Sequence, residues 1–161
     1  MLPAVNMFLN QVVAPANRTL GLDSHVANML VLGTAAQESQ FKYLEQLSGG
    51  PGIGLFQMET ATHDDLWRNW LRHRRLWRDR AYVWSATEAP ALPDASEMAW
   101  NLRYAATMTR LHYYRVKEPL PLTADPWALA AYYKTHYNTI HGKATLQQFV
   151  SNFNRYVLGA P

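Results

Sequence analysis

Apolar residues recur at helical spacing along most of the chain, and this pattern predicts a mainly α-helical fold. The clearest stretch follows Asp23-Ser24, a pair that is typical of a helix N-cap. Its apolar positions share one face and are Val26, Met29, Leu30, Gly33 and, close by, Ala36. We expect this helix to be central to the core.

Cap and breaker residues place the remaining helices. Pro3 lies near the start of the first and Pro15 beyond its end, Ser96 caps another with Glu97 in its first turn, and Asp125-Pro126 is a cap followed by proline. These helices are predicted over residues of about 3–13, 60–80, 96–115, 126–138 and 144–157. The apolar face of the last carries Leu146, Phe149, Val150, Phe153 and Val157.

Two stretches have the composition of loops. Residues 85–95 contain Pro90 and Pro93, and residues 40–58 are dense in glycine. No strand pattern is convincing, although a short hairpin near 47–58 is allowed. With no repeat and no low-complexity tract, residues 1–161 are expected to form one mainly α domain with at most a small β-hairpin.

The amino-acid composition limits the kinds of site and partner that the protein can have. The chain has no cysteine, which excludes disulfides and thiolate metal sites. A net charge of +3 favours anionic partners such as cell walls, lipopolysaccharide or nucleic acid, without choosing among them. Six Trp and nine Tyr suit sugar faces as well as a packed core.

Several common signals are missing. The first ten residues lack the basic and apolar regions of a signal peptide, and no run of about 18 apolar residues predicts a membrane span. His136 and His141 are five residues apart, and there is no His-x-x-x-His pair, so a metal site is unsupported. There is also no Gly-x-Ser-x-Gly elbow. No cofactor is expected.

Glu38 is the leading candidate for acid chemistry. It lies eight residues after Leu30 and four after Thr34, so it continues the face directed at the core. Burial and the negative end of the helix dipole both raise the pKa of a carboxyl group, as a general acid requires. The alternative is an ordinary helix-terminal glutamate, solvated or paired with Lys42.

A glycine-dense turn leads into Gly54-Leu55-Phe56-Gln57, 16 to 19 residues after Glu38. Glycines allow a ligand to approach the backbone closely, and Gln57 offers both a donor and an acceptor. The alternative is a tight connector before a helix. No Gly-Lys-Ser/Thr follows, so a phosphate loop is unsupported.

Together these residues resemble the catalytic region of the lytic transglycosylase family, whose lysozyme-like fold is shared with goose-type lysozymes. Glu38-Ser39 with Phe41 matches the first motif, and Gly54-Leu55-Phe56-Gln57 matches the second, with Phe56 in place of Met. For the third, Ala130-Ala131-Tyr132-Tyr133 has Tyr133 where Asn is usual, and Tyr137-Asn138 supplies a Tyr-Asn pair.

The resemblance implies cleavage of peptidoglycan between N-acetylmuramic acid and N-acetylglucosamine. Glu38 would protonate the leaving oxygen and then act as base, on the muramic C6 hydroxyl in a transglycosylase or on water in a lysozyme. The substrate-binding residues that it implies are Ser39, Gly54, Leu55, Phe56, Gln57, Tyr132, Tyr137 and Asn138.

Many glycosidases use a second carboxylate, for which the candidates are Glu45, Glu59, Asp64 and Asp65. None lies in a motif like that of Glu38. A single acid suffices when the acetamido group of the substrate assists, which favours a transglycosylase over a hydrolase.

The resemblance and the lack of an export signal indicate a phage protein, either a virion component or an endolysin. It would reside in the virion or in the host cytoplasm until release, with other phage structural proteins as partners. A non-enzymatic alternative is a structural or wall-binding tail component with the same fold.

Residues 67–80 hold six of the fifteen Lys and Arg residues, interleaved with Trp67, Trp70 and Trp77. This pattern fits an amphipathic helix with buried tryptophans and solvated arginines, or a surface for anionic cell-wall components or virion proteins. Nucleic-acid binding is a third reading, but nothing else supports it, and no nucleic-acid partner is expected.

Overall fold

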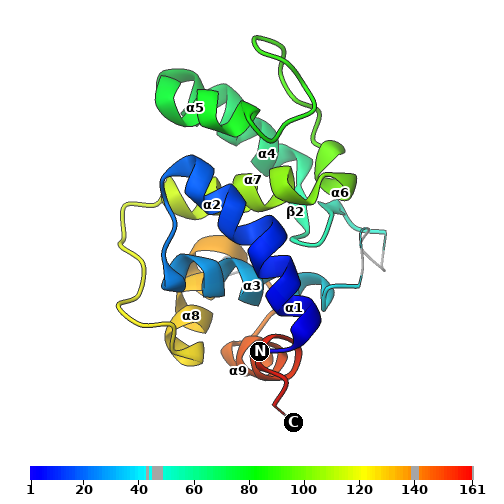
Figure 1. Ribbon diagram of the computed structural model, residues 1–161, viewed down its shortest axis with the longest axis vertical. Coiled ribbons are helices and arrows are strands. Elements are labelled where there is room, and N and C mark those ends of the chain that lie inside the picture. The colour runs from blue at the N-terminus through cyan, green and yellow to red at the C-terminus, as the bar shows by residue number, and fades with distance from the viewer. Residues whose placement is uncertain (43, 45–48, 139–141, 161) are drawn as a thin grey trace.

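The computed structural model describes residues 1–42, 44, 49–138 and 142–160, and these are mainly α-helical, as the sequence predicts (Figure 1). The helical elements are α1 (Pro3–Phe8), η1 (Leu9–Val13), α2 (Ala14–Leu20), α3 (His25–Ser39), α4 (Thr60–Asp65), η2 (Leu66–Trp70), η3 (Leu71–His73), α5 (Arg75–Tyr82), α6 (Glu97–Trp100), α7 (Leu102–Tyr114), α8 (Pro126–Tyr133), η4 (Lys134–Asn138), α9 (Leu146–Asn152) and η5 (Phe153–Leu158). Within the described residues, no helix is both long and apolar enough to cross a membrane.

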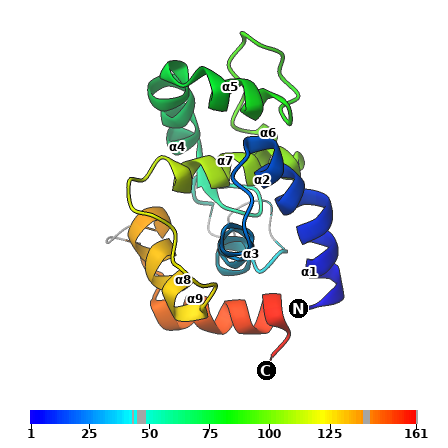
Figure 2. The same cartoon turned by 60° about the vertical axis from the view of Figure 1, so that its left-hand side comes forward.

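Helix α3 runs through the middle of the protein, and the other helices surround it (Figures 1 and 2). Ser24 caps it as predicted, because its Oγ accepts a hydrogen bond from the Ala27 amide at 3.1 Å. Burial extends beyond the predicted face to Val31, Leu32 and Ala35. The expectation of a central core helix is therefore confirmed.

Gly33 allows the last helical segment to pack directly on α3. A Cβ at this position would lie 2.5 Å from Cζ of Phe149 in α9 and 3.0 Å from Cδ2 of Phe153 in η5. Both rings are buried and stack on each other with 6.2 Å between centroids. Of the predicted apolar face of 144–157, Phe149, Phe153 and Val157 are buried, while Leu146 and Val150 are partly buried.

The first helix does not stop before Pro15, as the sequence analysis expected. It continues through η1 and α2 to Leu20 and ends at Gly21, which has φ +70°. Proline lacks an amide hydrogen and would clash with a carbonyl four residues earlier. The π-helical turn of η1 accommodates this proline, and the Gln11 carbonyl instead accepts a hydrogen bond from Arg103 Nε at 2.7 Å.

The helix predicted over 60–80 is interrupted. Arg74 has φ −133° and ψ 71°, and it separates α4, η2 and η3 from α5. Trp67 is buried and donates from Nε1 to the Tyr104 hydroxyl at 2.8 Å, whereas the Arg74 guanidinium lies over the Trp70 ring, 4.7 Å from its centroid. Trp67 thus faces inward while Arg72, Arg74 and Arg75 are exposed, as the amphipathic reading predicts. The pattern is incomplete, because Trp70 and Trp77 are only partly buried and Arg80 is partly buried and donates to the Leu20 carbonyl.

The helix predicted over 96–115 is divided at Asn101, whose side chain accepts from the Tyr104 amide and caps α7. Ser96, expected to be a cap, makes no side-chain cap bond. Glu97 is buried instead of solvated, and it accepts hydrogen bonds from Ser85 Oγ, the Ala86 amide and Asn101 Nδ2 at 3.0, 2.6 and 2.7 Å. This carboxylate fixes residues of the 85–95 loop against α6.

Two further features agree with what the sequence predicts. Asp125 caps α8, accepting from the Trp127 and Ala128 amides at 3.0 Å. The glycine-dense stretch contains the hairpin that the sequence allows, formed by antiparallel strands β1 (Gly52–Ile53) and β2 (Met58–Glu59). Gly52 pairs with Glu59, and Ile53 with Met58.

We predict that Gly33→Ala destabilises the protein. Alanine in a helix interior gains about 1 kcal/mol over glycine, but overpacking a filled core costs about 1–3 kcal/mol. Because the new methyl group would meet the buried Phe149 ring, we expect a net loss in urea denaturation. In the Phe149→Leu background the same change should cost less. A stabilised Gly33→Ala variant would show that this contact is not tight.

Candidate active site

Glu38 lies one residue before the end of α3 and is partly buried. Its Oε1 accepts a hydrogen bond from the hydroxyl of Tyr133, the last residue of α8, at 2.5 Å. Tyr133 is itself only 1% exposed. The carboxyl group is therefore held by a second helix, and its orientation is fixed from inside the core.

Burial raises the pKa of Glu38 from 4.5 to about 7, although the hydrogen bond from Tyr133 acts in the opposite direction. Within the described residues no cation forms an ion pair with Glu38, and the Lys42 ammonium lies over the Tyr156 ring, 5.6 Å from its centroid. Pairing with Lys42, the alternative weighed from sequence, is thus absent. Near neutral pH the group exists in both protonation states.

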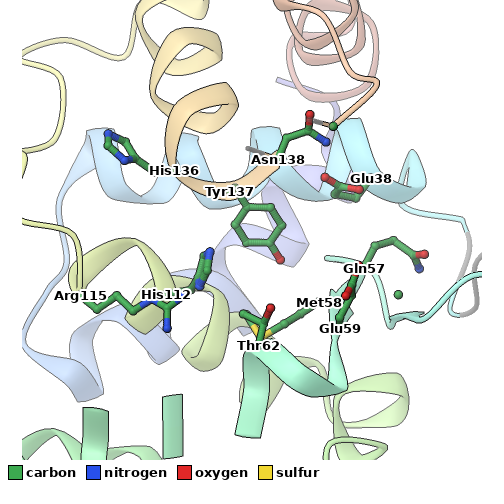
Figure 3. A pocket seen from close by; sticks show the side chains of 12 residues that line it. Glu38, Gln57, Met58, Glu59, Thr62, His112, Arg115, His136, Tyr137 and Asn138 are labelled. Atoms are coloured by element: carbon green, nitrogen blue, oxygen red, sulfur yellow. The ribbon is translucent and has the colours of Figure 1, made fainter. Parts of the chain in front are cut away.

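Two hollows meet at Glu38. One, of about 480 Å³, is lined by Glu38, Gly52, Gln57, Met58, Glu59, Thr62, His112, Arg115, His136, Tyr137, Asn138 and Gly142 (Figure 3). The other, of about 670 Å³, is lined by Gln37, Glu38, Gln40, Tyr133, Asn138, Lys143, Ala144, Gln148 and Asn152. Glu38 and Asn138 line both hollows, so both hollows adjoin the carboxyl group.

The hairpin brings Gln57 to this groove. Gly54 has φ +68°, and a Cβ there would collide with the Met98 carbonyl oxygen, so this position requires glycine. The Gly54 carbonyl accepts from the Gln57 amide at 3.1 Å and from its Nε2 at 2.7 Å. Leu55 and Phe56 are buried in the core. Within Gly54-Leu55-Phe56-Gln57, only Gln57 lines the groove.

The third sequence motif, Tyr137-Asn138, lines the same groove. Tyr137 lines the first hollow, and its hydroxyl donates to the Phe56 carbonyl at 2.8 Å, which ties η4 to the hairpin. Asn138 lines both hollows, and its Oδ1 accepts from Lys134 Nζ at 2.9 Å. Glu38, Gln57, Tyr137 and Asn138, widely separated in sequence, thus converge on one groove.

Besides Gly54, Leu55 and Phe56, two further residues expected to bind substrate do not line the groove. Ser39 is 1% exposed, and its Oγ donates to the Ala35 carbonyl at 3.1 Å, so the hydroxyl belongs to its own helix. Tyr132 lines a different cavity, and its hydroxyl donates to the Glu118 carbonyl at 2.8 Å. On α8, therefore, the side chain that contacts Glu38 is that of Tyr133.

The contact of Tyr133 with Glu38 was not predicted, since the sequence analysis noted Tyr133 only as standing where Asn is usual. A signal was present, because Tyr133 and Tyr137 are four residues apart and share a helical face. Their rings stack with centroids 5.9 Å apart.

The far end of the first hollow was also not predicted. His112, Arg115 and His136 lie there, away from Gln57 (Figure 3). Burial lowers the pKa of His112 to about 4, so its imidazole is neutral at pH 7. Its Nδ1 is buried and has no hydrogen-bond partner within the described part of the chain.

Of the candidate second carboxylates, Glu59 lines the first hollow together with Glu38 and is exposed to solvent. Asp64 interacts with His63 and Arg68, and Asp65 pairs with Arg115 at 2.5 Å. Hydrogen bonds from Asn69 and Arg115 hold the pKa of Asp65 below its usual range. Glu45 lies outside the described residues.

In comparisons with protein-family models, curated proteins and solved structures, none matches this chain. The described residues contain no group of three or more His, Asp or Glu side chains that could hold a metal ion. What this protein can do is therefore inferred from the geometry and electrostatics around Glu38.

Replacing Tyr133 with Phe should raise the pKa of Glu38 further. The hydroxyl stabilises the carboxylate form, and a hydrogen bond to a charged group contributes about 1.5–3 kcal/mol, or roughly 1–2 pH units. Carbon-detected NMR titration of the Glu38 carboxyl measures this shift. Tyr82→Phe, which removes the hydrogen bond to the Ala91 carbonyl, is the control and should leave the pKa unchanged. An unchanged value in Tyr133→Phe would contradict this role for the hydroxyl.

Proposed function

We propose that this protein is a peptidoglycan-cleaving glycosidase with a lysozyme-like fold, of the lytic transglycosylase type, in which Glu38 is the acid and base. The observation that carries the proposal is a carboxyl group of raised pKa, about 7, at the junction of two hollows. A glycan strand is long and neutral in its sugar rings, and it needs contacts on both sides of the bond that is cut.

In the proposed reaction, protonated Glu38 donates its proton to the oxygen of the bond between N-acetylmuramic acid and N-acetylglucosamine. The C1–O bond breaks, and the sugar alcohol leaves. Glu38, now a carboxylate, removes the proton from the C6 hydroxyl of the muramic residue, whose oxygen bonds to C1 and closes a 1,6-anhydro ring. The carboxyl group is restored, and no water is consumed. A pKa near 7 suits both steps at neutral pH.

The residues of the groove have different roles in the proposed reaction. Tyr133 orients the carboxyl group through its hydrogen bond. Gln57 and Asn138 offer polar groups that can bind hydroxyl and acetamido groups of the sugars. The Tyr137 ring forms part of the wall, where a flat apolar surface suits a sugar face.

A hydrolytic outcome is the second candidate, and the observation that favours it is Glu59 in the same hollow. An exposed carboxylate beside the groove can activate water as a base, as in inverting glycosidases. The cyclising reaction remains our first proposal, because the motifs around Glu38 resemble those of transglycosylases.

We further propose, from that resemblance, that the protein is phage-encoded and acts from a virion or as an endolysin, with other virion proteins as neighbours in the first case. A tail component without activity is the competing proposal. Activity of Glu38 variants separates the two.

Glu38→Gln should abolish clearing of cell walls in a zymogram, with a loss of at least 100-fold, because the amide cannot transfer the proton. Glu88→Gln, in an exposed loop, is the matched control and should retain activity. Equal clearing by wild type and Glu38→Gln would refute the mechanism, and no clearing by the wild type would favour the structural component.

The same variant should remain folded. The pKa of Glu38 is higher in the folded protein than its ordinary 4.5, so its contribution to stability is fully present below pH 4.5 and is lost as pH rises through about 7. That loss is at most about 3 kcal/mol and is reduced by solvent screening at this partly exposed site. At pH 8 Glu38→Gln should therefore unfold at the same or a higher temperature than wild type. A lower unfolding temperature for Glu38→Gln would mean that its loss of activity reflects a loss of structure.

Mass spectrometry of the released muropeptides should show 1,6-anhydro ends, and Glu59→Gln should retain the same products. Reducing ends alone, together with inactivity of Glu59→Gln, would reject the transglycosylase assignment in favour of hydrolysis.

A further inference from the structure

A third hollow, of about 330 Å³, lies where the end of α7 meets the loop that joins it to α8 (the yellow segment in Figure 2). Among its lining residues are Arg110, Tyr114, Lys117, Leu120 and Tyr132. It shares no lining residue with the two hollows at Glu38. It is therefore a separate site, and the proposed cleavage reaction does not use it.

Arg110 is the unusual group in this hollow. It is only 5% exposed, yet within the described residues it forms no ion pair with any carboxylate. Within the described part of the chain, its guanidinium donates one hydrogen bond, from Nε to the Leu22 carbonyl at 3.4 Å, which is long. Its Cζ lies 5.7 Å from the centroid of the Tyr114 ring. A buried cation is costly when no carboxylate balances it, and none pairs with Arg110 within the described residues.

The charge on Arg110 persists despite burial. Desolvation by burial lowers the pKa of Arg110 from its usual value. A guanidinium nevertheless stays protonated at neutral pH. Lys117 adds a second cation at the exposed part of the lining.

The other residues that line the hollow can pack against the apolar part of a ligand. Val116, Pro119 and Leu120 line the hollow together with the tyrosine rings. Glu118 also lines the hollow: its carbonyl accepts from the Tyr132 hydroxyl at 2.8 Å, and burial, together with the charge of its carboxylate, raises the pKa of Tyr132. The hydrogen bond ties the loop to α8 beside the hollow.

We propose that this hollow binds a small organic carboxylate, with its two oxygens on the Arg110 guanidinium and its apolar part against Tyr114 and Leu120. A planar carboxylate matches the paired donors of a guanidinium, and its single negative charge balances the single buried cation. The volume is at the lower end of the range for small-molecule sites, about 300–1,000 Å³.

Calorimetric titration with three probes of one shape tests this proposal: benzoate, phenyl phosphate and the neutral benzamide. We expect benzoate to bind the wild-type protein, more tightly than phenyl phosphate, and benzamide to bind at least tenfold more weakly. Arg110→Met should weaken benzoate at least tenfold, while Arg72→Met, which removes an exposed cation elsewhere, should leave it unchanged.

Three results would overturn the proposal: no benzoate binding, equal binding by Arg110→Met, or tighter binding of phenyl phosphate. Replacing an unpaired buried charge with an apolar chain should not lower the thermal midpoint of the unliganded protein. If Arg110→Met fails to fold, Lys117→Ala at the exposed part of the lining provides the second test. It should weaken benzoate severalfold, and an unchanged affinity would count against the site.

Discussion

The hydrogen bond from Tyr133 to Glu38 is the interaction on which the candidate site depends. Burying a carboxyl group at the end of the central helix is unfavourable for its charged form, and the tyrosine hydroxyl limits that cost without supplying a counter-charge. The result is a group that gains and loses a proton near pH 7. A lysine or arginine in the place of Tyr133 would stabilise the carboxylate and remove its value as an acid.

Other tyrosines extend this arrangement through the core. The Tyr113 hydroxyl lies 2.7 Å from Thr34 Oγ and joins α7 to α3, while Tyr137 joins η4 to the hairpin carbonyl of Phe56. The rings of Tyr113 and Tyr137 pack with centroids 5.3 Å apart. The hydroxyls of Tyr113, Tyr133 and Tyr137 thus bond neighbouring elements while their rings pack in or against the core. The position of Glu38 is therefore coupled to the packing of α7, α8 and the hairpin.

Two helix caps were predictable from local chemistry, since Ser24 and Asp125 accept the expected hydrogen bonds, whereas Ser96 does not. That Glu38, Gln57, Tyr137 and Asn138 line a common groove was predictable only from the resemblance of their motifs to those of transglycosylases. Prediction from the sequence failed where contacts between distant residues determine the structure. The carbonyl that Pro15 leaves free is taken by Arg103, a residue far along the chain, so the helix continues. Likewise, whether Tyr132 or Tyr133 faces Glu38 depends on how α8 is rotated against α3, which no local pattern specifies.

The central claim is that a glycan lies along both hollows with the bond to be cut at Glu38. A crystal structure of the inactive Glu38→Gln protein with an oligomer of N-acetylglucosamine tests this most directly. The account predicts sugars on both sides of residue 38, with a glycosidic oxygen within about 3 Å of its side-chain amide, the reach of a proton donor. An oligomer bound away from this groove, or in one hollow with no glycosidic oxygen near residue 38, would contradict it.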